Sequence, residues 1–62
     1  MNHSVGDCVN NTKIKKYSNG DIIELGTQGD IRKAYIASNS YSVFFTDTEK
    51  AHRVLERDLT SC

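Results

Sequence analysis

Glycine-containing turns divide this chain into segments too short for long helices, and the spacing of these turns constrains the fold more than any other sequence feature. Gly6, Gly20, Gly26 and Gly29 are the only glycines, and proline is absent. Turn signals separated by short apolar runs are typical of β-structure. With 62 residues the chain forms one domain, and a domain of this size buries only about 60% of the surface that its unfolded form exposes. We therefore expect one small all-β domain of marginal stability.

The clearest strand signals lie in the middle of the chain. Residues 31–37 are rich in β-forming residues and have turn residues on both sides. Residues 41–46 alternate, so Phe44 lies with Ser42 and Thr46 on the face opposite to the other three residues. The core residues predicted from this alternation are Tyr41, Val43 and Phe45. Phe44 is then predicted to point outward, unless a loop or a bend in the sheet covers it.

The first part of the chain is more polar. Residues 6–9 indicate a turn that leads into a short first strand. Residues 10–21 predict a long loop or an irregular hairpin, closed by the turn signal at residues 18–21. Ile14 and Tyr17 are the two residues that this segment has to bury.

The segment 46–59 supports two interpretations. As a helix it has a capping box formed by Thr46 and Glu49, followed by an apolar stripe. As β-structure it has a hairpin turn at residues 47–50, a strand at 51–55 and a tight turn before a last short strand. Local rules slightly favour the helix, so the preference for the strand depends on a resemblance of the whole chain.

The order of signals resembles the SH3-like small barrels of short bacterial proteins. The matching segments are Gly6-Asp7-Cys8-Val9, Gly26-Thr27-Gln28-Gly29-Asp30-Ile31, Tyr41-Ser42-Val43-Phe44-Phe45 and Glu56-Arg57-Asp58-Leu59. The resemblance implies a barrel of about five short antiparallel strands at residues 6–62, after a flexible N-terminal tail at residues 1–5. The alternative is a meander of about four strands with a C-terminal helix.

Proteins with this order of signals differ in function, so the resemblance fixes no activity. They include photosystem I subunit IV, the variable chain of ferredoxin–thioredoxin reductase, KOW and Tudor modules, and the plasmid-borne type II dihydrofolate reductases. Most are accessory subunits or binding modules. The reductases carry a Val-Gln-Ile-Tyr run, and residues 51–55 lack it here. The sequence therefore predicts no catalytic residue and no enzyme, with a reductase-like oligomer as a distant alternative.

The same resemblance places the two cysteines together. First and last strands pair in such barrels, so Cys8 and Cys62 are expected to be neighbours. Free thiols are the default, because no secretion signal precedes the domain and reduced cysteines are usual in the cytoplasm. The cysteines and the two histidines match no zinc module. We expect no metal and no cofactor.

The charge balance guides the choice among partners. Eight basic and eight acidic residues give a net charge of zero, unlike the strongly basic domains of dedicated nucleic-acid binders. No apolar run approaches the ~20 residues of a membrane span. We therefore expect a cytoplasmic, non-catalytic module that binds a protein partner or copies of itself, with no role for a membrane.

Local clusters of cations and rings keep a KOW- or Tudor-like nucleic-acid module as the alternative. Lys13, Lys15 and Lys16 stand next to Tyr17, and a second basic pair stands near Tyr35. Rings would stack on bases and cations would neutralise phosphates; scattered, solvated lysines are the simpler interpretation. The candidate binding residues are Tyr17, Arg32, Lys33, Tyr35, Phe44 and His52. For His52, a solvated position on the outer face of a strand is the simpler expectation.

Overall fold

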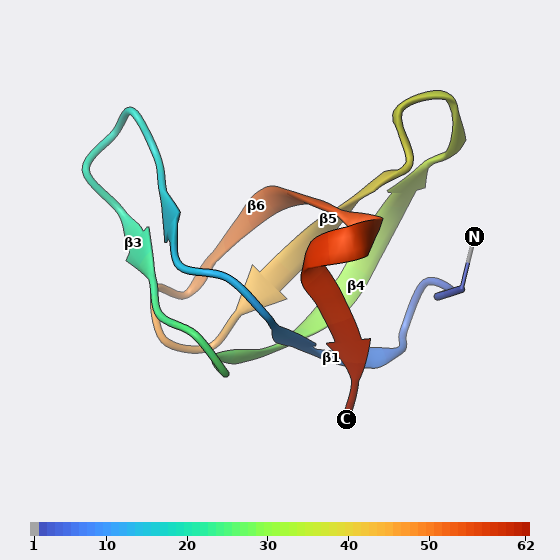
Figure 1. Ribbon diagram of the computed structural model, residues 1–62, viewed down its shortest axis with the longest axis horizontal. Helices are drawn as coiled ribbons and strands as arrows, with labels where there is room; N and C mark the ends of the chain where they lie inside the picture. Colours follow the sequence, from blue (N-terminus) through green and yellow to red (C-terminus); the bar gives the residue numbers. More distant parts are fainter. Residues whose placement is uncertain (1) are drawn as a thin grey trace.

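The computed structural model describes residues 2–62 and consists of antiparallel strands joined by tight turns (Figure 1). The strands are β1 (Cys8–Asn11), β2 (Lys15–Lys16), β3 (Ile22–Ile23), β4 (Gln28–Tyr35), β5 (Ser40–Phe45), β6 (Lys50–Leu55) and β7 (Leu59–Ser61). Two single 3-10 turns, η1 (Ile36–Ser38) and η2 (Glu56–Asp58), are the only helical elements in this part of the chain. The all-β class is confirmed. The strand count is higher than predicted, because β2 forms within the expected loop or irregular hairpin at residues 10–21 and β3 follows directly after it.

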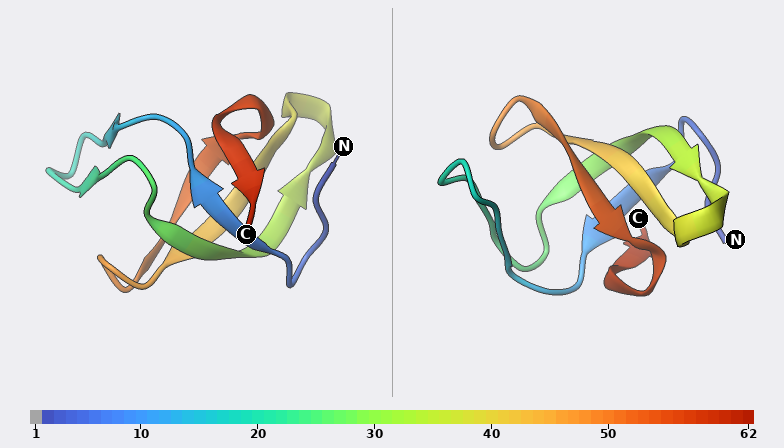
Figure 2. Two further views of the ribbon diagram at one scale, coloured as in Figure 1. Left: turned by 60° about the horizontal axis from the view of Figure 1, so that its bottom comes forward. Right: turned by 90° about the horizontal axis from the view of Figure 1, so that it is seen from above.

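Five strands form the main sheet in the order β6-β5-β4-β1-β7, and β2 and β3 form a separate ladder. We call residues 12–27, which carry β2 and β3, the arm. The arm extends to one side of the main sheet (Figures 1 and 2). β1 pairs with β7, with Val9 opposite Ser61, so the two ends of the chain meet in the sheet. This is the pairing that the resemblance implied.

A disulfide joins Cys8 to Cys62 across that pairing. The two Cα atoms are 5.4 Å apart, and the amide of Cys62 donates a hydrogen bond of 3.2 Å to the carbonyl oxygen of Cys8. The expected proximity of the two cysteines is therefore confirmed. The default of free thiols is wrong for this structure, because the strand register places the sulfur atoms within bonding distance.

The core lies on one face of the main sheet, and the arm contributes Ile23 to it. The fully or almost fully buried hydrophobic residues are Val9, Ile23, Ile31, Tyr41, Val43, Phe45, Val54 and Leu59. The predicted core positions on β5 are all 0% exposed, so that prediction is confirmed. Ile14 was expected to be buried but is 56% exposed, whereas Ile23 of the same arm is 0% exposed.

Gly29 is required where β4 crosses β5. A Cβ atom at this position would lie 2.7 Å from the carbonyl oxygen of Phe44 and 2.7 Å from Cγ1 of Val43. Such a contact is sterically forbidden without a shift of backbone, so glycine permits the close approach of the two strands.

The C-terminal segment is β-structure, as the resemblance implied, and the alternative C-terminal helix is wrong. Glu49 has a φ of 54° in the turn between β5 and β6, a left-handed conformation that a helical capping box cannot use. β6 then pairs along its length with β5, with Val54 opposite Tyr41. Long-range pairing and burial of Val54 override the local helical pattern.

The N-terminal residues lie against the main sheet. The amide of His3 donates to the hydroxyl of Tyr41 at 3.2 Å, and the amide of Asn2 donates to the carboxylate of Glu56. The division into a tail at 1–5 and a domain at 6–62 stays a prediction, and Met1 lies outside the described residues. Within residues 2–62, no helix has the length and apolar character needed to cross a membrane.

Candidate binding surface

The side of β4, β5 and β6 that faces away from the core is the outer face, and it holds most of the predicted site residues. Strand alternation and register define its rows. Phe44 lies between Asp30 and Ala51, and Ser42 lies between Lys33 and Arg53. Tyr35 and Leu55 flank Ser40 in the next row. The outer face therefore consists of Asp30, Arg32, Lys33, Tyr35, Ser42, Phe44, Ala51, Arg53 and Leu55, and Ser40 is buried beneath it.

Cations lie over both aromatic rings of the outer face. The guanidinium of Arg32 is 4.5 Å from the ring centroid of Phe44. The guanidinium of Arg53 is 4.0 Å from the centroid of Tyr35, and the ammonium of Lys33 is 5.4 Å from the same ring. Each contact lies within the range of a cation–π attraction. The contacts bring Arg32, Lys33, Tyr35 and Phe44 into one surface, as candidates for binding.

A β-bulge explains how consecutive basic residues share this surface. The register of β4 against β5 shifts between Ile31 and Lys33, so Arg32 is the additional residue. In a regular strand Arg32 and Lys33 would point to opposite faces. The bulge cancels that alternation and directs both side chains to solvent. Nothing in the sequence alone indicates the bulge.

Arg53 belongs to the outer face but was not predicted as a site residue. It alternates with His52 and Val54, which are buried. The period of two places Arg53 and His52 on opposite sides of the strand at residues 51–55, but it does not indicate which of them faces solvent. From the sequence, His52 was placed on the outer side, and that assignment excluded Arg53.

The positive charge of the outer face is only partly neutralised. Arg32 forms an ion pair with Asp30. Among residues 2–62, no carboxylate forms an ion pair with Lys33 or Arg53. Three cations and one carboxylate thus share the surface, and the two unpaired cations lie on either side of Ser42.

Tyr17 and His52 lie apart from this surface, where the arm contacts β6. Their rings stack with centroids 4.3 Å apart and an interplanar angle of 22°. The hydroxyl of Tyr17 donates to the carbonyl oxygen of Arg53 at 3.1 Å. His52 is 8% exposed, so its predicted solvated position is wrong, because alternation along β6 turns it inward with Val54.

Charged groups surround this arm contact. Nε2 of His52 is 3.3 Å from a carboxylate oxygen of Asp21, and the ammonium of Lys50 is 3.5 Å from the same oxygen. Burial, followed by the nearby charge of Asp58, raises the pKa of Tyr17. We interpret Tyr17 and His52 as residues that hold the arm against β6.

The lysine cluster of the arm is largely used within the molecule. Lys13 and Lys15 both form ion pairs with Asp58, which is 2% exposed. The hydrogen bond from Lys15, ahead of the charges of both lysines, holds the pKa of Asp58 below its usual range. The amide of Thr12 also donates to the carbonyl oxygen of Asp58 at 2.8 Å. These ion pairs therefore hold the arm against the turn that carries Asp58.

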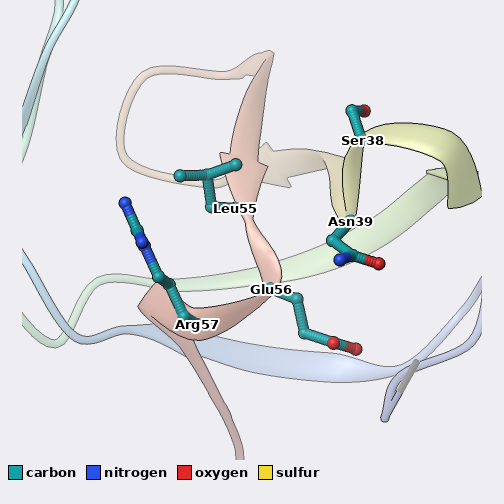
Figure 3. Close-up of a pocket in the computed structure, with 5 residues that line it drawn as sticks. All are labelled: Ser38, Asn39, Leu55, Glu56 and Arg57. Atoms are coloured by element: carbon teal, nitrogen blue, oxygen red, sulfur yellow. The ribbon is translucent and has the colours of Figure 1, made fainter.

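A hollow of about 410 Å³ lies at one end of the outer face. Ser38 and Asn39 lie on one side of it, and Leu55 and Arg57 lie on the other, near the junction of β6 and η2 (Figure 3). Its lining residues are Ser38, Asn39, Leu55, Glu56 and Arg57. The amide of Glu56 donates to the carbonyl oxygen of Asn39 at 2.8 Å and ties the two walls together. Leu55 belongs to both the hollow and the outer face.

Two observations describe the acidic and metal-ligating side chains around this surface. In residues 2–62, no group of three or more His, Cys, Asp or Glu side chains has metal-binding geometry. Glu56 in the hollow is already engaged, because the Tyr41 hydroxyl donates to its carboxylate at 2.8 Å. Hydrogen bonds from the amide of Asn2 and then from Tyr41 lower the pKa of Glu56. An ionised, hydrogen-bonded carboxylate is a poor general acid.

Comparison with known proteins finds no matching family model, no significantly similar curated protein and no significantly similar solved structure.

Proposed function

We propose that this chain is an SH3-like small barrel that serves as a non-catalytic binding module for a protein partner. Three features support the fold assignment: the sheet order β6-β5-β4-β1-β7, the arm that follows β1, and the 3-10 turn before β7. These three features occur along the chain in the same order as the sequence segments on which the resemblance to SH3-like barrels depends. The functional part of the proposal depends on the outer face.

The observation that carries the function is the set of cation–aromatic contacts on the outer face. Arg32 over Phe44 and Arg53 over Tyr35 present planar guanidinium groups to solvent. Arginine and aromatic residues are enriched at protein interfaces and dominate their binding energy. The balanced net charge of the whole chain favours a protein partner over nucleic acid.

Single-stranded nucleic acid is the second candidate, supported by the alternation of cations and rings on the same surface. Guanidinium planes and aromatic rings stack on bases, and basic side chains neutralise phosphates. The rings of Phe44 and Tyr35 each have a cation over one face, so a base would have to displace or stack on that cation.

Site-specific photocrosslinking in cells tests both candidates. A photoreactive amino acid replaces Ala51, which is exposed on the outer face, or Thr60, which is exposed on β7 as a matched control. We expect protein adducts from position 51 that are lost with Arg53→Glu, and none of these adducts from position 60. An adduct between two copies of the chain identifies self-association. Nuclease-sensitive adducts support the second candidate, and equal adducts from both positions contradict the proposed surface.

We also propose a cytoplasmic location, in which the Cys8–Cys62 bridge of this structure would be reduced, because disulfides persist only in oxidising compartments. Trapping the thiols in cells with an alkylating reagent tests the location. Reduced Cys8 and Cys62 support the cytoplasm, whereas an intact bridge favours an oxidising compartment.

A further inference from the structure

The unpaired positive charge at the centre of the outer face indicates an anionic ligand, and this inference rests on the proposed function. Lys33 and Arg53 lie opposite each other across Ser42, and neither forms an ion pair with a carboxylate of residues 2–62. The contact with Tyr35 holds the guanidinium of Arg53 over the sheet. A fixed guanidinium plane binds a carboxylate through two parallel hydrogen bonds.

The hollow provides a second contact for the ligand, at a defined distance from Arg53 along β6. Leu55 follows Arg53 by two positions on β6 and points to the same side. Two residues of a strand span about 6.6–6.8 Å, so an extended ligand along β6 reaches both side chains with residues two positions apart. Leu55 supplies an apolar wall to the hollow, and the ionised Glu56 beside it repels a second carboxylate.

We propose that the outer face binds an extended peptide segment in which an acidic residue and an aliphatic residue stand two positions apart. The carboxylate binds Arg53, with Lys33 close by, and the aliphatic side chain enters the hollow beside Leu55. The order of the two residues depends on the direction in which the peptide runs. A spacing of three directs the aliphatic side chain away from the hollow, because neighbouring side chains of an extended peptide alternate.

Fluorescence anisotropy with labelled ten-residue peptides in a Gly/Ser background tests the inference. One pair of peptides has Glu and Leu two positions apart, in both orders. A second pair has them three positions apart, and a third pair replaces Glu with Gln at the spacing of two. We expect one of the Glu peptides at the spacing of two to bind about tenfold more tightly than its Gln counterpart, a ratio typical of one charge-assisted hydrogen-bonded pair.

Variants of the protein assign this preference to the two side chains. Arg53→Gln should remove the preference for Glu over Gln, and Leu55→Ser should remove the preference for the spacing of two. Lys16→Gln is the matched control, because Lys16 is an exposed cation on the arm, and it should leave every Kd unchanged. Equal binding at both spacings, or a Glu preference that survives Arg53→Gln, overturns the inference.

A labelled oligothymidine of ten nucleotides is tested in the same assay. If the oligothymidine binds in an Arg53-dependent manner and the peptides do not bind, the result contradicts the peptide inference and supports the nucleic-acid candidate. If crosslinking at position 51 captures a protein but the peptides show no preference, only the chemistry of the partner is wrong. Absence of outer-face adducts would instead remove the proposed function itself.

Discussion

The imidazole of His52 stacks on the phenol ring of Tyr17, with centroids 4.3 Å apart and planes inclined by 22°. This contact joins the arm to β6, two elements that the sheet hydrogen bonds leave separate. The Tyr17 hydroxyl adds a hydrogen bond to the Arg53 carbonyl oxygen at 3.1 Å. The arm thus fixes the backbone of a strand whose other side carries the outer face.

Loss of the Tyr17 ring should release the arm. We expect Tyr17→Ala to lower the free energy of unfolding by about 2 kcal/mol, since it removes an aromatic stack and a partly buried ring. Tyr17→Phe keeps the stack and should cost about 1 kcal/mol, the contribution of one hydrogen bond. Amide hydrogen exchange should accelerate in the arm of Tyr17→Ala but not in β4 or β5. Equal acceleration throughout the sheet would contradict a local role.

The buried face of residues 41–46 was predictable from the sequence, whereas the burial of His52 was not. Alternation along residues 41–46 correctly placed Tyr41, Val43 and Phe45 in the core, because that strand has one buried face. The same period applies to residues 51–55, but polar His52 gave no sign of burial. Its environment is provided by Tyr17 and Asp21, which belong to a segment predicted only as a loop or irregular hairpin. Contacts between distant segments of this kind cannot be read from local patterns.

The outer face was predictable in part. Four of its members, Arg32, Lys33, Tyr35 and Phe44, were identified from their residue types. Their convergence depends on the bulge between Ile31 and Lys33, which strand periodicity does not foresee. The role of Asp58 was missed for another reason. A carboxylate in a tight turn suggests turn formation, whereas burial against Lys15 arises only when the arm folds back.

Phe45 and Phe44 should differ strongly in their effect on stability. Phe45 is 0% exposed, and we expect Phe45→Ala to cost about 3–5 kcal/mol, enough to unfold much of so small a domain. Phe44→Ala removes a half-buried ring with one cation–π contact, and about 1 kcal/mol is expected. Urea denaturation followed by circular dichroism measures both. A folded Phe45→Ala together with an unfolded Phe44→Ala would reverse the assignment of the two faces.

Asp58 should make stability depend on pH in the acidic range. Its pKa is lowered in the folded chain, chiefly by the hydrogen bond from Lys15, so the folded state binds fewer protons than the unfolded state. The stabilisation is therefore complete above the ordinary carboxyl pKa of about 3.9 and is lost as pH falls through the folded-state value.

The variant Asp58→Asn isolates this contribution. We expect the free energy of unfolding, measured with urea at a series of pH values, to fall less steeply below pH ~4 in Asp58→Asn than in the parent chain. Some dependence of the free energy of unfolding on pH should remain in Asp58→Asn, because the pKa of Glu56 is also lowered. The double variant Asp58→Asn/Glu56→Gln should show a still weaker dependence. Identical pH profiles for the parent and Asp58→Asn would show that Lys15 and Lys13 do not stabilise the buried carboxylate.

Reduction of the Cys8–Cys62 bridge should lower stability by a large share of the total. The bridge spans 54 positions of the sequence, so it restricts almost the whole unfolded chain, and the entropic model assigns about 4 kcal/mol to such a loop. It also anchors β7 beside β1, next to the turn that carries Asp58. We expect the urea midpoint to fall when a dithiol reductant is added to dilute oxidised protein.

The double variant Cys8→Ser/Cys62→Ser should resemble the reduced chain and should not respond to reductant, which separates the effect of the bridge from other effects of the reagent. Mass spectrometry of the oxidised parent should show a monomer two hydrogens lighter than the reduced one. Formation of intermolecular dimers alone would contradict the antiparallel pairing of β1 with β7, because that register brings the two Cα atoms to 5.4 Å.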